Sequence, residues 1–239
     1  MKDDIYQFQK FLKSKNVIHG VSTKAFGSMK RLKDQTDRES LEKFAKKIGI
    51  TGDIVCMQQI HSGSVVIIEN TNELRIAETD GLLTNKKNIS LAVLTADCLP
   101  ILFYDPRKEV IGIAHAGYKG LLNHIIENMI SNFVSYFKSD SKDIIVGIGP
   151  SIETICYQVS VELLERFQEA FPSFENIFVE KDEKFFLDLR GIAQQCLMKD
   201  GIVKEHIEIM DICTKSDPNF YSYRGGDKND RFVSIISLL

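Results

Sequence analysis

The chain has 239 residues, of which 44% are hydrophobic and 26% are charged, a composition typical of a globular protein. Its 30 Lys and Arg residues nearly balance its 33 Asp and Glu residues, and the resulting net charge of −3 argues against nucleic acid as the main partner. No apolar run approaches the roughly 18 residues that cross a bilayer, so we expect no membrane partner.

The sequence carries no sign of subdivision or export. The five prolines are scattered and no linker or repeat is visible, so we predict a single domain over residues 1–239. Asp3 and Asp4 place acid where a signal peptide is positively charged. The five cysteines are odd in number and widely spaced, which is typical of free thiols. We therefore expect a cytoplasmic protein without disulfides.

In chain order, helical and strand-like segments alternate irregularly. Thr36-Asp37-Arg38-Glu39 has the spacing of a capping box, and apolar residues then follow a helical period until Gly49. Five short apolar runs of strand length come next, at 54–57, 65–68, 91–94, 101–104 and 110–114. A long amphipathic helix is predicted over 119–137, a strand over 144–148, helices over 160–171 and 187–199, and strands over 207–210 and 232–236.

These segments favour an α/β protein with mixed sheets. Most of the predicted strands are continuous apolar runs without alternation, which indicates strands covered on both faces. Three of them lie between residues 91 and 114 with no helix between, so a strict βαβ order is excluded. We therefore expect a mixed sheet, or two sheets, with helices outside.

Reactive side chains stand where three of the predicted strands end. They are His61, Cys98 with Asp97, and His115 followed by Gly117. One thiolate and two imidazoles form a catalytic type of zinc set, with three protein ligands and one open position. Separations of 37 and 17 residues exclude a zinc finger or ribbon. Cys98 and His115 could equally be a metal-free nucleophile and base, and the sequence leaves both hypotheses open.

Further residues are candidates for substrate binding. Lys119 follows Gly117 at a helix N-terminus, which is a plausible anion site. The polar segment 214–224 ends in Phe220-Tyr221-Ser222-Tyr223-Arg224, either a buried aromatic cluster or a stacking surface with an anion-binding Arg224. Cys156 and Cys213 lie in segments that could approach the site.

Eight blocks of the sequence then resemble, in order, one protein family. The family is that of the purine nucleoside phosphorylases also called laccase-domain or multicopper polyphenol oxidase proteins. The blocks are Gly20-Val21-Ser22-Thr23, Gln59-Ile60-His61, Thr79-Asp80-Gly81, Thr95-Ala96-Asp97-Cys98-Leu99-Pro100, His115-Ala116-Gly117, Gly149-Pro150 with Cys156-Tyr157-Gln158-Val159, Leu187-Asp188-Leu189, and Cys213-Thr214 with Ser222-Tyr223-Arg224.

The resemblance implies an α-β-β-α sandwich, similar to deamidase toxins with a Cys/His pair. It implies phosphorolysis of adenosine, inosine and methylthioadenosine, together with adenosine deamination. It identifies zinc as the cofactor, with copper as an alternative metal. The resemblance implies His61, Cys98 and His115 as the metal ligands. Together with the residue chemistry, it leads us to predict Cys98, His115 and Asp97 as catalytic residues. The predicted substrate or phosphate ligands are Lys119, Arg224, Asp80 and Ser22. The oligomeric state stays open.

The chain departs from the family pattern at arginine positions. In the family's H-A-G-W-R-G block, Tyr118 replaces the Trp and Lys119 replaces the Arg. Lys24 replaces the Arg of the S-T-R-x-G-G block, and Gly225 replaces the second Arg of S-Y-R-R. A lysine keeps the charge but loses the bidentate fork that holds phosphate. We expect these departures to spare the metal set and to bear on phosphate affinity.

A four-copper oxidase is excluded for a monomer by counting histidines. Such an enzyme needs a blue-copper site and a further histidine-rich cluster, usually built from H-x-H pairs. The chain has no H-x-H, and only His19, His124 and His206 remain outside the candidate site. A single copper ion at that site could still give weak oxidase activity.

Overall fold

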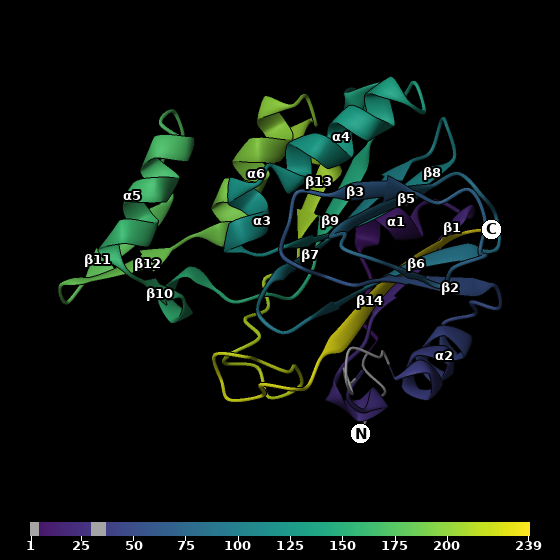
Figure 1. Ribbon diagram of the computed structural model, residues 1–239, viewed down its shortest axis with the longest axis horizontal. Helices are drawn as coiled ribbons and strands as arrows, with labels where there is room; N and C mark the ends of the chain where they lie inside the picture. The colour runs from purple at the N-terminus through teal and green to yellow at the C-terminus, as the bar shows by residue number, and fades with distance from the viewer. Residues whose placement is uncertain (1–4, 30–36) are drawn as a thin grey trace.

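Two β-sheets lie face to face between outer helices in a computed structural model that describes residues 5–29 and 37–239 (Figure 1). The first sheet has the order β1-β14-β6-β2-β4 and the second has the order β13-β9-β7-β8-β5-β3. The strands of the first are β1 (Val17–Val21), β14 (Phe232–Leu238), β6 (Ile89–Thr95), β2 (Asp53–Met57) and β4 (Arg75–Ile76). Those of the second are β13 (Ile207–Ile209), β9 (Ile145–Ile148), β7 (Leu99–Asp105), β8 (Val110–Ala116), β5 (Gly81–Thr84) and β3 (Val65–Ile67).

Both sheets are mixed, as the sequence predicts. In the first sheet β2 runs parallel to β6 and β4, and the remaining pairs are antiparallel. In the second sheet β13–β9 and β3–β5 are parallel and the others antiparallel. Helix α2 (Arg38–Lys47) covers the outer face of the first sheet, and α4 (Ile125–Ser135) and α6 (Leu189–Lys199) cover the second. The predicted α-β-β-α sandwich is confirmed.

Strand β6 explains why the apolar runs do not alternate. Leu91 and Val93 belong to the core cluster between the two sheets, whereas Ala92 and Leu94 pack in the cluster beneath α2. Because both faces of the strand are buried, its central positions from Leu91 to Leu94 are all apolar. Continuous apolar runs of strand length were therefore the correct signal for the central strands.

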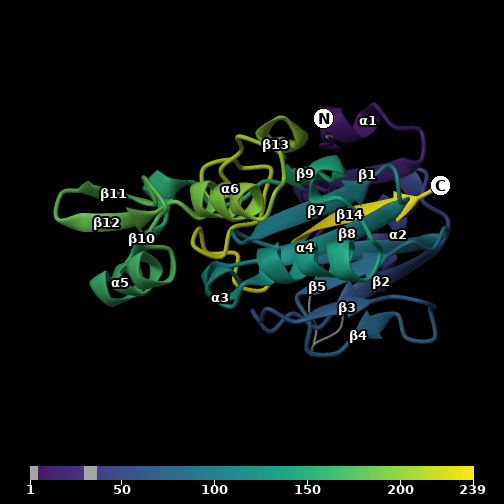
Figure 2. The ribbon, with the colours of Figure 1, turned by 90° about the horizontal axis from the view of Figure 1, so that it is seen from above.

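A small antiparallel sheet with its own helix projects to one side of the sandwich (Figures 1 and 2). It consists of β10 (Gln158–Val159), β12 (Lys184–Leu187) and β11 (Phe178–Lys181), with α5 (Val161–Ala170) packed beside it. The Ser160 side chain caps α5 by accepting a hydrogen bond from Leu163 N. No helix of the described ranges combines the length and the apolar character that crossing a membrane requires.

The predicted helix over 119–137 is wrong as a single element. The chain forms α3 (Tyr118–Leu122) and α4, separated by Asn123 and by His124 in the left-handed region at φ 59°. The segment around Gly63 presses on this break, since the Asn128 side chain donates to Gly63 O and a Cβ on Gly63 would collide with Asn123 O. Tertiary contact therefore overrides the helical period.

The structure differs from the sequence prediction at several other segment ends. Helix α2 begins at Arg38 with Asp37 as its N-cap, and the predicted cap Thr36 lies outside the described residues. Gly49, at φ 91°, ends this helix as predicted. The sequence analysis missed helix α1 (Gln9–Leu12) and the short or partly exposed strands β1, β4, β5, β10, β11 and β12.

His19 of β1 is a buried structural histidine. Its side chain is 1% exposed, and its Nε2 accepts a hydrogen bond from Phe8 N at 2.7 Å. The ring stacks on Phe8 and meets the edge of Phe11. Burial lowers the pKa of His19 from 6.5 to about 4, because the charged imidazolium is disfavoured away from water.

Acid should therefore destabilise the protein through His19. In the unfolded chain His19 takes up a proton below pH 6.5, whereas the native ring stays neutral until about pH 4. The contribution of neutral His19 to the unfolding free energy is therefore fully present above pH 6.5. It falls by about 3 kcal/mol as the pH is lowered from 6.5 to 4. Urea unfolding of wild type and His19→Gln between these pH values measures this. Equal loss of stability in both proteins would contradict the role of His19.

Candidate active site

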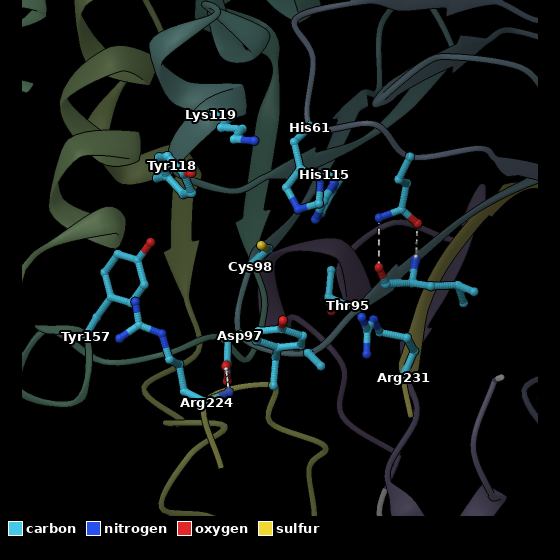
Figure 3. Close-up of a pocket in the computed structure, with 14 residues that line it drawn as sticks. His61, Thr95, Asp97, Cys98, His115, Tyr118, Lys119, Tyr157, Arg224 and Arg231 are labelled. Carbon is cyan, nitrogen blue, oxygen red and sulfur yellow. Dashed lines mark hydrogen bonds between the residues drawn. The ribbon is translucent and has the colours of Figure 1, made fainter. Parts of the chain in front are cut away.

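Three side chains from distant segments meet at one end of the sandwich (Figure 3). His61 follows β2, Cys98 lies in the turn between β6 and β7, and His115 stands near the end of β8. Their ligand atoms all lie within 4.8 Å of one another, and the two imidazole rings are 4.7 Å apart. The structure thus brings together the three residues that the sequence analysis grouped.

Gly117 makes this convergence possible. The pairing of β7 with β8 sets Leu99 opposite Ala116, which brings Cys98 beside Gly117. A Cβ at Gly117 would lie 2.8 Å from Cys98 Sγ and 3.2 Å from His61 Cδ2. Any larger residue would push against two members of the cluster, so the glycine of the H-A-G block serves close approach.

The cluster is held by strained backbone at two positions. His61 has φ 63° and Asp97 has φ 90°, both in the region that favours glycine. Such conformations cost free energy and persist only where surrounding contacts enforce them. They aim the side chains of His61 and of Cys98, the residue after Asp97, toward the same point.

Asp80 supplies the contacts that hold the backbone around His61. Its carboxylate is fully buried and accepts hydrogen bonds from the amides of Ile60, His61 and Ser62 and from Ser62 Oγ, at 2.7–3.1 Å. It also pairs with His115 Nδ1 at 2.8 Å. Burial opposes the charge, yet the bonds to His115 and Ser62 outweigh it and lower the pKa of Asp80 to about 2. The Asp80 bond to Nδ1 leaves Nε2 of His115 as the nitrogen that faces the cluster.

Cys98 and His115 form a coupled acid–base pair. Burial disfavours the charge on each, but mutual attraction and hydrogen bonding overcome it. The pKa of Cys98 falls to about 6, helped by His61, and the pKa of His115 rises to about 9, helped by Asp80. These opposite pKa shifts favour a thiolate beside an imidazolium in the metal-free protein at neutral pH.

The cluster opens into a pocket of about 400 Å³. Tyr118 and Tyr157 stand on one side of it and Thr95 and Arg231 on the other, with Cys98 between them (Figure 3). Three cationic side chains line the pocket, namely Lys119, Arg224 and Arg231. This combination of aromatic surface and positive charge suits a ligand with a planar ring and an anionic group.

Asp97 and Arg224 fasten the C-terminal polar segment to the pocket. The carboxylate of Asp97 accepts from Thr214 Oγ1 and from the Arg224 amide, both at 2.7 Å. The Arg224 guanidinium lies 4.6 Å from the Tyr157 ring centre and donates to Gln158 O at 3.0 Å. Both oxygens of Asp97 are thus engaged within the protein.

Several predicted residues lie outside the pocket. Ser22 is fully buried, and its Oγ accepts from Val233 N at 2.9 Å. Lys24 pairs with Asp227 at 3.3 Å and therefore does not line the pocket. Helix α3, in which Lys119 lies, has only five residues, so it offers a weaker anion site than the long helix that was predicted.

Cys213 lies outside the pocket as well, although the sequence analysis considered it. Its Sγ accepts from Glu153 N at 3.5 Å, and hydrogen bonds from Ser216 and Glu153 outweigh burial and lower its pKa. Cys156 neighbours it, and burial together with the Cys213 thiol raises the pKa of Cys156. The polar segment 214–224 combines both interpretations, because Phe220 is buried in a core cluster while Tyr223 and Arg224 line the pocket.

The sequence analysis gave no role to several residues that line this pocket, among them Gln59, Thr95 and Arg231. Gln59 exchanges two hydrogen bonds with the backbone of Leu94, from Nε2 to the carbonyl and from the amide to Oε1. It thereby continues the β2–β6 ladder with a side chain after β2 has ended. Thr95 belonged to a recognised block and Arg231 directly precedes a predicted strand, but neither position carries a signal without the strand pairing.

The cluster can hold one metal ion. A thiolate and two imidazoles suit Zn²⁺ or copper, and the Asp80–His115 bond is the kind of contact that orients a histidine ligand. Over residues 5–29 and 37–239, which include all five histidines, this is the one such group of His, Cys and acidic residues. Among the described residues, His19, His124 and His206 do not gather into a second cluster of this kind.

The chain is similar to one family model and to relatives that share one name. Residues 15–239 match the family described as multi-copper polyphenol oxidoreductase laccase. The chain is 37% identical over 164 residues to purine nucleoside phosphorylase YlmD of Bacillus subtilis, covering 67% of this chain and 59% of the relative. It is 33% identical over 187 residues to a purine nucleoside phosphorylase of Clostridium acetobutylicum, covering 77% and 76%. The chain thus spans less than two thirds of the Bacillus subtilis relative.

The fold has a close counterpart among solved structures. The crystal structure of Bacillus licheniformis hypothetical protein YfiH superposes with a TM-score of 0.89 at 27% sequence identity. The match covers 99% of this chain and 97% of that protein.

Proposed function

Because the chain belongs to the multi-copper polyphenol oxidoreductase laccase family, in which relatives carry the name purine nucleoside phosphorylase, we propose that it is a zinc-dependent purine nucleoside phosphorylase. Its substrates are a purine nucleoside (adenosine, inosine or methylthioadenosine) and inorganic phosphate. The observation that carries the proposal is the His61–Cys98–His115 cluster at the base of a pocket with tyrosines and three cations.

The cluster residues fit a zinc ion by their chemistry. His61 and His115 offer imidazole nitrogens and Cys98 offers a thiolate, whose lowered pKa favours the form that binds metal. Zinc held there supplies a Lewis acid next to the substrate. Copper is the alternative ion, because the same ligands bind it more tightly than zinc.

The surrounding residues bind and orient. Tyr118 and Tyr157 offer a surface for the purine ring, and Lys119 and Arg224 bring positive charge that attracts phosphate. Asp80 keeps His115 in one tautomer and orientation through Nδ1. Asp97, which the sequence analysis predicted to be catalytic, acts in this proposal as a positioning residue for the segment that carries Arg224.

Adenosine deamination is the second activity of the proposal. It requires a carboxylate that moves protons between water and the base. Asp97 lines the pocket and Asp80 is bonded to His115, and the oxygens of both already accept hydrogen bonds from the protein. We therefore expect deamination to be slower than phosphorolysis.

The test is incubation of adenosine with the purified protein, with and without phosphate, followed by separation of the products. We expect adenine and ribose 1-phosphate only when phosphate is present, and inosine at a lower rate in both cases. His115→Ala should abolish all three products, because it removes one member of the cluster and the partner of Asp80. If no product forms above that variant, the proposal is wrong.

A metal-free cysteine hydrolase is the second candidate. The observation in its favour is the thiolate–imidazolium pair of Cys98 and His115, which is the resting state of a cysteine nucleophile and its base. This candidate predicts rapid alkylation of Cys98 and activity that survives chelation. The zinc enzyme predicts loss of activity with a chelator and recovery with added zinc.

A further inference from the structure

Thr95 has a buried hydroxyl for which the described structure offers no hydrogen-bond partner. The residue is 1% exposed, and Oγ1 is among the buried side-chain polar atoms without a hydrogen-bond partner. The residue ends β6 and lines the pocket. An unpaired hydroxyl inside a protein is destabilising, and an acceptor supplied by a ligand would relieve that cost.

Arg231 lies beside this hydroxyl at the same wall. Strand pairing sets Phe232 opposite Thr95, and Arg231 directly precedes Phe232 at the pocket end of the pair. Its Nη1 donates to Lys228 O at 3.1 Å and Asp230 O at 2.7 Å, which holds the guanidinium at the pocket edge. Figure 3 shows the side chain directed toward Thr95 and away from Tyr118 and Tyr157, and its guanidinium carbon lies 6.0 Å from the ring centre of Tyr223.

The other arginine of the pocket is committed to the opposite side. Arg224 packs on Tyr157 and donates to Gln158 O, and in Figure 3 both it and Tyr157 are well separated from Thr95 and Arg231. The pocket therefore has one side with Tyr118 and Tyr157 and another side with the Thr95 hydroxyl and the Arg231 guanidinium, with Cys98 between. A hydroxyl donor next to a guanidinium is a recurrent arrangement for holding phosphate oxygens.

We propose that Thr95 Oγ1 and the Arg231 guanidinium form the subsite that anchors inorganic phosphate. The inference rests on the proposed function for the identity of the anion. It orients the substrates, with the purine ring toward Tyr118 and Tyr157 and phosphate on the opposite wall. Lys119 and Arg224 then add positive charge to the pocket without being the anchor.

Two variants test the subsite by a binding measurement that needs no turnover. Titration with inorganic phosphate, followed by calorimetry, should show affinity about 3- to 10-fold weaker in Thr95→Val and at least 10-fold weaker in Arg231→Gln. Arg224→Gln should change phosphate affinity less than Arg231→Gln. Unchanged affinity in Thr95→Val and Arg231→Gln, or absence of phosphate binding to wild type, overturns the subsite.

Unfolding measurements separate a ligand-binding hydroxyl from a structural one. Thr95→Val removes only an unpaired hydroxyl, so its unfolding midpoint in urea should equal or exceed that of wild type. Thr214→Val removes the bond to Asp97 and should lower the midpoint. Ser234→Ala removes another buried, unpaired hydroxyl of the described chain that lies away from the pocket, and should leave phosphate affinity unchanged. A lowered midpoint in Thr95→Val would instead support a structural role.

Kinetics distinguish failure of the subsite from failure of the proposed function. If the protein cleaves adenosine, Arg231→Gln should raise the KM for phosphate at least 10-fold with little change in the KM for adenosine. Phosphate binding through Arg231 without cleavage of adenosine would refute the proposed function and support the subsite. Cleavage of adenosine with an unaltered KM for phosphate in Arg231→Gln would support the proposed function and refute the subsite.

Discussion

Cys98→Ala should remove the metal and with it nearly all activity. We expect metal analysis of protein purified without an affinity tag to give close to one zinc per wild-type chain and less than about 0.1 per variant chain. The reason is that Cys98 is the one member of the cluster that carries a negative charge, so its loss leaves two neutral imidazoles facing a divalent ion. We expect adenosine phosphorolysis to fall about 1,000-fold, which corresponds to about 4 kcal/mol of transition-state stabilisation.

Cys196→Ala is the matched control for this prediction. Cys196 is fully buried in α6 among core residues, and burial raises its pKa well above the usual range. Its removal creates a small cavity and lowers stability by roughly 1 kcal/mol, but should leave zinc content and activity unchanged. Stoichiometric zinc in Cys98→Ala would show that the cluster is not the metal site. Full activity of wild type after chelation would favour the cysteine hydrolase.

The sheets and the site cluster could be predicted because both depend on local sequence patterns, namely apolar runs of strand length and the reactive residues that follow them. The central positions of strands buried on both faces, such as β6 and β7, form apolar runs without alternation, which distinguishes them from strands with one face in solvent. His61, Cys98 and His115 each follow or end such a strand, and strand ends of an α/β sandwich meet at one edge. The single domain over residues 1–239 stays a prediction.

The rest could not be predicted because it depends on pairing between distant segments. Gly63 contacts Asn123 and interrupts a helix whose own period runs through the break. Ser22 belongs to a recognised block, yet the β1–β14 pairing places its hydroxyl against Val233 and not in the pocket. Thr95 becomes notable only because, in the described structure, no neighbour satisfies its hydroxyl. The spacing of residues in the sequence does not show which buried hydroxyl groups lack a hydrogen-bond partner.

For Asp80 the structure differs most from the role predicted from the sequence. The sequence analysis considered it as a substrate or phosphate ligand. In the structure it is fully buried and bonded to the 60–62 backbone and to His115, which leaves it no contact with the pocket. Its position defines it as the residue that aligns two histidines at once.

Asp80→Asn should therefore weaken both the fold and the metal site. The amide keeps the size of the carboxylate, but its NH₂ group must face a donor, either the amides of Ile60–Ser62 or His115 Nδ1. Breaking one side of a buried charged pair costs about 3–5 kcal/mol of unfolding free energy. Loss of the partner that orients a histidine ligand should weaken zinc binding about 10- to 100-fold.

Asp105→Asn separates this effect from the general cost of replacing a buried aspartate. Asp105 is also fully buried, and its Oδ1 accepts from the amides of Arg107 and Lys108 in the turn after β7, while Oδ2 has no partner in the described structure. An amide can satisfy that arrangement, so we expect a smaller loss of stability and unchanged zinc affinity. Competition with a chromophoric chelator measures the affinity, and urea unfolding measures the stability. Wild-type zinc affinity in folded Asp80→Asn would show that His115 needs no help from Asp80 to stay in place.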